Sequence, residues 1–339
     1  MAAEKLTYDS IMRDLKARKF KPVYIIMGEE SYYIDKLSDY LEQNVLLPEE
    51  RDFNQTVVYG TDTSAAQVVD MARRYPMMAE RQVVMVKEAQ NMRSWDKFEN
   101  YLKNPQPSTV LVICYKNGTI DARKAFMRLA SGVGVVFNSQ KKRDRELPAF
   151  IEKYTKENNA SIEPKATQMI ADFVGTDLSR LASEIDKVLI SLNESDRRIT
   201  PEIVESKIGI SKDYNFFELR DAIISHDVTK ANRIVKYIDS NPKTVSLYSF
   251  LPQLFKYFQN LMIAHFAKDK SERGIASALD LGSPWSAKFY IDGMRFYNAV
   301  KTMNIIRKIR VTDAKSKGID NPNTSPGDLM KELIYFIFY

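Results

Sequence analysis

Residues 21–31 read KPVYIIMGEES, an apolar run that ends at Gly28 and is followed by two glutamates. Its continuous apolar part, Val23 to Met27, is typical of a strand that is covered on both faces of a sheet. In α/β proteins that bind nucleotides, the turn after the first strand holds the phosphate groups. The run therefore predicts the first strand of a sheet and marks where a phosphate loop would lie.

The turn after this strand lacks the residues that hold a triphosphate. A phosphate loop needs glycines that let backbone N–H groups surround the phosphates, a lysine that reaches them and a hydroxyl for magnesium. Here a single glycine precedes Glu29 and Glu30, whose carboxylates would repel a triphosphate. The strand predicted at 83–86 is followed by Lys87, where an ATPase of this kind places an aspartate for magnesium. Both features argue against nucleotide binding.

Strand-like and helical runs alternate through the first 140 residues. After the first strand, further strands are predicted at 53–59, 83–86, 110–114 and 133–137. Amphipathic spacing predicts helices at 7–19, between Ser31 and Pro48, and at 64–74. This alternation predicts an α/β fold with a mostly parallel sheet and helices on both of its faces.

Strand signals stop after Asn138, and the rest of the chain is predicted to be helical. Residues 139–145, SQKKRDR, form a charged break and are the best candidate for a linker. Helices are predicted at 148–158, 164–174, 177–193 and 201–207, and throughout 211–339. Because 339 residues exceed what one core usually holds, two or three domains are expected.

Composition places the chain among ordinary water-soluble proteins, with 44% hydrophobic and 28% charged residues. Cys114 is the single cysteine, so an internal disulfide is impossible and a reducing compartment fits. The first residues contain no apolar signal core, and no run approaches the roughly 20 apolar residues of a membrane span. We expect a cytoplasmic protein with no membrane partner.

Residues 74–81, RYPMMAER, place two methionines directly before the strand at 83–86. Pro76 has a fixed φ and no N–H, so it ends a helix or opens the next element. Nothing in the strand itself requires Met77 and Met78. The pair is either a local plug of the core, which is the usual role of methionine, or a surface group offered to a partner.

Other candidate chemistry is sparse. His226 and His265 are far apart in the sequence, and neither has a cysteine or histidine at the spacing of a metal site. Lone histidines of this kind are most often structural or solvent-facing. Cys114 lies within a predicted buried strand and is interpreted as a small hydrophobic core residue.

The positive charge of the chain lies in its last third. Lys and Arg outnumber Asp and Glu by 19 to 13 in residues 211–339, whereas the counts nearly cancel before residue 211. Arg307, Lys308 and Arg310 belong to a basic stretch on a predicted helix, and Lys141, Lys142 and Arg143 belong to the linker. Both groups are candidates for contact with DNA or a partner, but solvated surface is the favoured interpretation.

Five segments in order along the chain resemble one protein family. They are residues 21–30, 174–187, 217–223, 281–285 and 312–318. The first resembles the family's opening strand and its loop without nucleotide, the second resembles its lid helix, and the others resemble parts of its last domain. On these residues the chain is similar to the delta subunits of the bacterial DNA polymerase III clamp loader, which are relatives of the AAA+ ATPases.

The resemblance implies three domains: an AAA+-like α/β domain at 1–140 that binds the sliding clamp, a small helical lid domain at 141–210 and an all-α collar domain at 211–339. The collar would join gamma/tau and delta prime subunits in a hetero-pentameric loader that acts on primed DNA. The chain would have no cofactor and no catalysis of its own, although it would be part of a DNA polymerase holoenzyme.

The family's clamp-opening element is a pair of apolar residues just before the third strand, usually Leu-Phe after a serine. The matching positions here are Met77 and Met78, preceded by Pro76. The resemblance thus implies that these three residues bind the clamp and help to open its ring. Two other functions stay open, namely an ATPase with a divergent phosphate loop and a DNA-binding adaptor that acts through the basic last third.

Overall fold

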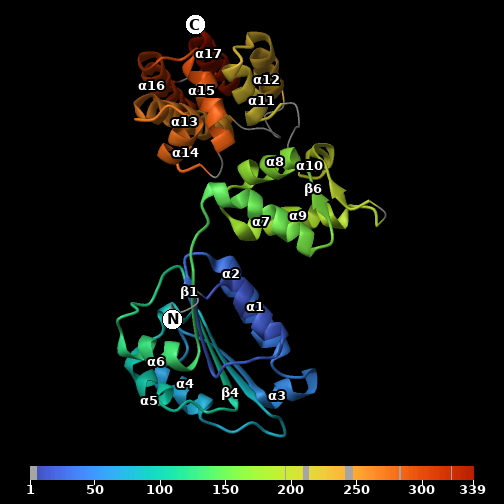
Figure 1. Ribbon diagram of the computed structural model, residues 1–339, viewed down its shortest axis with the longest axis vertical. Coiled ribbons are helices and arrows are strands. Elements are labelled where there is room, and N and C mark those ends of the chain that lie inside the picture. The colour runs from blue at the N-terminus through green and yellow to red at the C-terminus, as the bar shows by residue number, and fades with distance from the viewer. Residues whose placement is uncertain (1–5, 195, 209–213, 241–246, 282–283, 322) are drawn as a thin grey trace. The chain divides into compact units, whose positions relative to one another are not determined.

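The computed structural model describes residues 6–194, 196–208, 214–240, 247–281, 284–321 and 323–339 (Figure 1). The chain forms two compact units. One consists of Met1–Arg143 and Thr176–Ser179, and the other consists of Asp144–Gly175 and Arg180–Tyr339. The domain boundary predicted between residues 210 and 211 lies outside the described residues, so the division into three domains stays a prediction.

Five parallel strands form the sheet of the first unit, which confirms the predicted α/β architecture. Their order across the sheet is β2-β3-β4-β1-β5. Their bounds are β1 (Val23–Gly28), β2 (Gln55–Tyr59), β3 (Gln82–Lys87), β4 (Thr109–Lys116) and β5 (Val135–Ser139). Since every pairing is parallel, the carboxyl ends of the strands share one edge of the sheet and the amino ends share the opposite edge.

Helices cover both faces of this sheet. Successive residues of β1 point to opposite faces, so Ile25 joins one buried cluster and Ile26 joins the other. The bounds of the five main helices are α1 (Tyr8–Lys16), α2 (Ser31–Asn44), α4 (Ala65–Ala72), α5 (Phe98–Leu102) and α6 (Ala125–Val133). The first cluster packs under α4, α5 and α6, and the second packs under α1 and α2.

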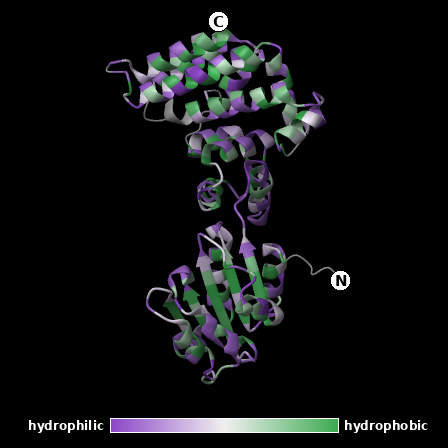
Figure 2. Cartoon of the chain, turned by 90° about the vertical axis from the view of Figure 1, so that its left-hand side faces the viewer, coloured by the Kyte–Doolittle hydropathy of each residue, from purple (hydrophilic) through white to green (hydrophobic). Residues whose placement is uncertain are grey.

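Figure 2 shows that the strands of this sheet are mostly hydrophobic. Ile25 and Ile26 are both almost fully buried. Burying a side chain of this size stabilises a fold by about 1.5–3 kcal/mol. The sheet therefore gives the loops at its two edges a firmly packed base.

Short helices complete the first unit. They are η1 (Pro48–Glu50), α3 (Arg51–Asn54), η2 (Ala89–Asn91) and η3 (Trp95–Lys97). The strand predicted at 53–59 is wrong at its start, because Phe53 is helical and β2 begins at Gln55. The aromatic and β-branched residues of the segment 53–59 favour a strand. The helix nevertheless continues to Asn54, whose side chain donates to the Glu50 carbonyl at 3.0 Å.

Helices form most of the second unit. The bounds are η4 (Asp144–Glu146), α7 (Leu147–Glu157), α8 (Pro164–Val174), α9 (Leu178–Ile190), α10 (Pro201–Ile208), α11 (Phe216–Ile224), α12 (Val228–Ser240), α13 (Leu247–Phe266), α14 (Glu272–Ala278), η5 (Pro284–Ala287), α15 (Lys288–Met294), α16 (Ala299–Ser316) and α17 (Pro326–Phe338). Of the family-like segment predicted at 281–285, Gly282 and Ser283 lie outside the described residues.

The expectation that strands end after Asn138 is wrong. Two short strands, β6 (Ser161–Ile162) and β7 (Arg198–Ile199), pair in parallel, with Ile162 opposite Ile199. Each strand has only two residues, so the alternation of apolar and polar residues that identifies a strand cannot be recognised in the sequence.

The helices from α11 onward enclose a core of their own, which includes the fully buried Leu254, Phe258 and Leu333. The buried hydroxyl of Tyr297 donates to the carbonyl of Ile223 at 3.1 Å, so this polar group is satisfied inside the core. Within the described ranges, no helix has both the length and the apolar character that a membrane span requires.

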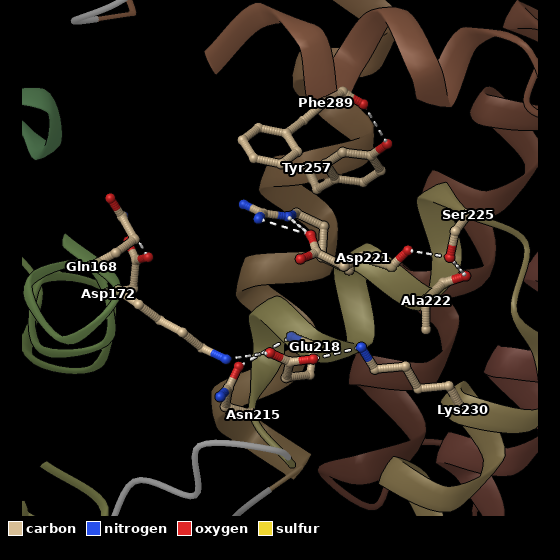
Figure 3. Close-up of polar contacts among 12 residues, drawn as sticks. Gln168, Asp172, Asn215, Glu218, Asp221, Ala222, Ser225, Lys230, Tyr257 and Phe289 are labelled. Carbon is tan, nitrogen blue, oxygen red and sulfur yellow. Dashed lines mark hydrogen bonds and ion pairs between the residues drawn. The ribbon is translucent and has the colours of Figure 1, made fainter. Parts of the chain in front are cut away.

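A polar cluster joins α8 to α11 and α12 in the second unit (Figure 3). Glu218 of α11 pairs with Lys165 of α8 at 2.9 Å and with Lys230 of α12 at 2.5 Å. Nearby in α8, Asp172 accepts a hydrogen bond from Gln168 at 2.6 Å, and burial raises the pKa of this carboxyl to about 6. The carboxylate of Glu218 thus bridges two lysines from α8 and α12.

Candidate functional site

The loop between α4 and β3, residues 73–81, carries the predicted pair of methionines at the amino edge of the sheet. The exposed fraction of the side chain is 62% for Met77 and 103% for Met78, while Pro76 is half-buried. Methionines that plug a core would be buried. The structure therefore rules out the plug and leaves two apolar side chains in solvent.

A buried amide holds this loop at Met77. Asn54 is only 4% exposed, and its side chain lies against the backbone of Met77. The N–H of Met77 donates to Oδ1 of Asn54 at 2.6 Å, and Nδ2 of Asn54 donates to the carbonyl of Met77 at 2.9 Å. Because both polar groups of one residue are engaged, the position of the Met77 backbone is fixed relative to α3.

A second amide holds the two ends of the loop. Gln82, the first residue of β3, donates through Nε2 to the carbonyl of Arg74 and to Oγ1 of Thr109, the latter at 2.8 Å. The hydroxyl of Thr109 in turn donates to the carbonyl of Ala72 at 2.8 Å. Gln82 and Thr109 are both buried. These bonds connect the end of α4 to the start of the sheet beneath the exposed methionines.

Met78 adopts a backbone conformation that is uncommon for its residue type. Its φ is 55°, in the left-handed region that glycine and asparagine occupy more readily. A residue with a side chain keeps such a conformation only when its surroundings determine it, and the cost is of order 1–3 kcal/mol. Here the bonds of Asn54 and Gln82 on either side of Met78 supply that restraint.

Two aromatic side chains extend the exposed apolar surface. Phe53 is 73% exposed and precedes the Asn54 that holds Met77, and Tyr75 is 79% exposed within the loop. We call Phe53, Tyr75, Met77 and Met78 the apolar loop surface. These residues lie on α3 or on the loop that Asn54 joins to it. Sequence reasoning missed Phe53 because it assigned this residue to a strand.

The turn at the opposite edge of the sheet, after β1, is closed by the chain itself. The carboxylate of Glu30 accepts the N–H of Tyr32 at 3.0 Å and so caps the first turn of α2. The N–H of Glu30 donates to the carbonyl of Ser139 at 3.1 Å. Burial raises the pKa of the Glu30 carboxyl, against the effect of the hydrogen bond from Tyr32. A carboxylate thus occupies the helix N-terminus at which a phosphate would bind.

The close approach of β5 also leaves no room at this turn. Gly28 has a φ of 142°, and a Cβ added there would lie 2.0 Å from the carbonyl oxygen of Ser139. Only glycine fits both the conformation and the space. The backbone after β1 is therefore packed against the end of β5 and does not form an open phosphate loop.

Ion pairs occupy two further strand ends at this carboxyl edge. Lys87, at the end of β3, pairs with Glu42 of α2 at 2.7 Å, and Lys116, at the end of β4, pairs with Asp35 of α2 at 2.5 Å. The hydrogen bond to Glu42 raises the pKa of Lys87, so its amine stays charged. A cation fixed at the end of β3 stands where a magnesium-binding carboxylate would be required.

The predicted basic residues fall into different compact units and are not equally accessible. Lys141 and Arg143 are exposed after β5, while the ammonium of Lys142 lies 5.9 Å from the centroid of the Tyr33 ring. On α16, Arg307 and Arg310 are exposed, but Lys308 is half-buried. Its ammonium pairs with Glu332 of α17 at 2.5 Å, so it contributes to helix packing.

The remaining sequence candidates have structural surroundings. The ring of His226 stacks on Phe296 with centroids 5.2 Å apart, and Nε2 of His265 lies 2.7 Å from the carbonyl oxygen of Tyr297. Cys114 is buried in β4, and burial raises the pKa of its thiol to about 12. Each of these three groups therefore has contacts that account for it within its own compact unit.

Comparisons with known proteins agree with this architecture. Residues 24–140 match the family model described as DNA polymerase III, delta subunit. The DNA polymerase III subunit delta of Bacillus subtilis (strain 168) is 24% identical over 319 residues, which cover 91% of this chain and 91% of that protein. The sequence matches confirm the predicted resemblance to the delta-subunit family.

A solved structure described as the Bacillus subtilis DNA clamp loader delta protein is similar to this chain. Its TM-score is 0.61 at 20% identity, and the match covers 98% of this chain and 99% of that one. At this level of identity, the likeness shows a shared fold. The shared fold extends over both compact units.

Proposed function

We propose that this chain, a relative of the DNA polymerase III delta subunit, binds a sliding clamp through the apolar loop surface and opens the ring of the clamp. The single observation that carries the proposal is that Met77 and Met78 are exposed on a loop whose backbone is fixed by buried amides. In this function, the chain acts through the free energy of binding to the clamp and does not catalyse a reaction.

The expected energies are sufficient for such a role. Burying each methionine in an apolar pocket of the clamp would contribute about 1.5–3 kcal/mol. Since Asn54 and Gln82 already hold the loop, little ordering would oppose binding. If the loop fits the open ring better than the closed one, this difference in affinity shifts the ring toward opening.

The chain would not itself bind or hydrolyse ATP. Glu30 caps α2 where phosphates would lie, and Lys87 stands where magnesium would need a carboxylate. The energy of nucleotide binding would come from neighbouring subunits of the loader. These two residues also argue against the alternative of an ATPase with a divergent phosphate loop.

The proposed division of labour follows the domains implied by the family resemblance. Residues 1–140 would bind the clamp, 141–210 would form the lid, and 211–339 would form the collar that joins gamma/tau and delta prime subunits. The helical packing of α11 to α17 supports a collar role. Within the loader, the exposed basic candidates for contact with primed DNA or a neighbouring subunit are Lys141, Arg143, Arg307 and Arg310.

The test is the affinity of the full chain for its cognate sliding clamp. We expect the Met77→Ala/Met78→Ala variant to bind the clamp roughly tenfold or more weakly, because two anchor side chains are lost. The matched control is Met303→Ala, which removes an exposed methionine of α16 and should not alter affinity. Unchanged clamp affinity in a correctly folded double variant would refute the proposal.

A further inference from the structure

Methionine exposure is concentrated at the apolar loop surface. Among the methionines that the structure describes, only Met77, Met78 and Met303 are more than a third exposed, at 62%, 103% and 39%. The others are buried or half-buried, among them Met27, Met85 and Met330 in the cores. A small oxidant in solvent therefore reaches the sulfur atoms of Met77 and Met78 with the least obstruction.

The backbone of the loop cannot fold back against the core without breaking buried hydrogen bonds. Asn54 holds the N–H and the carbonyl of Met77, and Gln82 holds the carbonyl of Arg74. The side chains of residues 77 and 78 are thus presented outward in the free chain. The same property that favours docking leaves them open to chemical modification.

We propose that Met77 and Met78 form a peroxide-sensitive modification site, and that their oxidation to methionine sulfoxide weakens clamp binding. This inference rests on the proposed function. In each step a lone pair of the thioether sulfur attacks one oxygen of hydrogen peroxide, the O–O bond breaks and an S–O bond forms. The sulfur loses two electrons, the peroxide is reduced, and its other oxygen leaves as water after proton transfer.

The physical effect of the added oxygen is to place a polar acceptor where an apolar side chain has to be buried. Oxidation converts a flexible apolar side chain into a polar and chiral one. A polar group without a hydrogen-bond partner is unfavourable in an apolar pocket. We expect the dissociation constant for the clamp to rise roughly tenfold or more, as for the loss of an anchor side chain.

Competing thiol chemistry is suppressed by the fold. Cys114 is buried, and burial raises the pKa of its thiol to about 12, so the reactive thiolate is scarce near neutral pH. Met303 on α16 is the remaining exposed methionine among the described residues and serves as an internal reference for the rate of oxidation. A loss of clamp binding on peroxide treatment can therefore be assigned to residues 77 and 78.

The experiment treats the full chain with hydrogen peroxide, maps sulfoxides by peptide mass spectrometry and measures affinity for the cognate clamp. We expect sulfoxide to form at Met77 and Met78 before Met303, and clamp affinity to fall in step with it. The two methionine sulfoxide reductases, one for each epimer, should restore affinity. Clamp that is bound before the peroxide is added should protect residues 77 and 78.

Two variants test which methionines cause the loss of clamp affinity after peroxide treatment. Met77→Leu/Met78→Leu removes both sulfur atoms, and its clamp affinity, whatever its starting value, should not change on peroxide treatment. Met303→Leu should keep the starting affinity and the full sensitivity of the wild type. Thermal unfolding before and after treatment shows whether the fold remains intact.

The outcomes separate this inference from the proposed function. If the untreated chain binds the clamp and its affinity is unchanged once residues 77 and 78 carry sulfoxide, the inference is wrong and the proposed function stands. If the leucine double variant stays sensitive, the modification acts elsewhere and the inference is also wrong. If the untreated chain does not bind the clamp at all, the proposed function fails first.

Discussion

Two loops of the same parallel sheet have opposite character. The loop after β1, at the carboxyl edge, is closed by the Glu30 cap and by the approach of Ser139 to Gly28. The loop before β3, at the amino edge, projects Met77 and Met78 into solvent. Both loops are fixed by hydrogen bonds to neighbouring elements, so they differ in what they expose and not in how firmly they are held.

The difference shows where this fold can bind another molecule. At the carboxyl edge the charged groups of Glu30, Lys87 and Lys116 already have partners within the chain. At the amino edge the exposed apolar side chains would gain from burial against a partner. A sheet whose usual ligand edge is filled can thus present a binding surface at its other edge.

The largest expected effect tests whether the first loop is closed. Gly28→Ala should lower the free energy of unfolding by about 3 kcal/mol or more, because the new Cβ meets the Ser139 carbonyl and φ is positive. Urea unfolding of the full chain measures the change. Gly132→Ala is the control within the same unit, because its Cβ meets nothing within 4 Å. If the two variants were equally stable, the turn after β1 would have room for a side chain at residue 28 and would not be closed.

The second test concerns the support of the exposed loop. Asn54→Ala leaves the N–H and carbonyl of Met77 without their partner, which should destabilise the fold by about 1–3 kcal/mol. Clamp affinity should fall several-fold as well, because a loop that is less ordered has to be fixed on binding. Asn104→Ala, at an exposed position after α5, is the matched control.

Two measurements distinguish positioning from simple stability for Asn54. Clamp binding is measured at a temperature at which the variant is fully folded, and hydrogen exchange of the Met77 amide reports on the loop itself. We expect faster exchange of this amide together with weaker binding. Weaker binding with unchanged protection of the amide would mean that Asn54 does not act through the loop.

The smallest expected effect is a pH dependence at the closed edge. Burial raises the pKa of Glu30 in the folded chain above its ordinary value of 4.5. The folded state therefore holds this proton more tightly, so the contribution of Glu30 to stability is full below the ordinary pKa and is lost as the pH rises through the folded pKa. Relative to the wild type, Glu30→Gln should gain stability as the pH rises above the ordinary value of 4.5 and through the folded pKa.

We expect this gain to be small, since glutamine can still accept the N–H of Tyr32 without bringing a charge into the turn. Urea unfolding of both proteins across this pH range measures it. A difference that does not change with pH would show that Glu30 is not buried as an anion. The variant should still bind no ATP, because Lys87 remains in place.

Much of the first unit could be predicted from the sequence because its signals are continuous. Residues Val23 to Met27 form an uninterrupted apolar run, and Glu29 and Glu30 after a single glycine predict a turn that differs from a phosphate loop. These predictions depend on local residue chemistry. The parallel sheet followed from the alternation of strands and helices, although the strand order needed the structure.

The supports of the exposed loop could not be predicted, because they join segments distant in the chain. Asn54 contacts Met77 across 23 positions, and Gln82 contacts Thr109 across 27. Nothing in the sequence distinguishes Asn54 or Gln82 from an asparagine or glutamine on the surface. The sequence also does not decide whether Met77 and Met78 are exposed, since methionine fills cores as readily as it covers binding surfaces.

The hydrogen bonds that Asn54 makes with residue 77 all end on backbone atoms. These bonds do not depend on which side chains stand at positions 77 and 78, although the left-handed φ of residue 78 disfavours a β-branched residue there. Replacing either methionine by another unbranched side chain would change what the loop exposes without removing these hydrogen bonds. The fold thus holds the backbone of the loop by contacts that are separate from the chemistry of the side chains that the loop exposes.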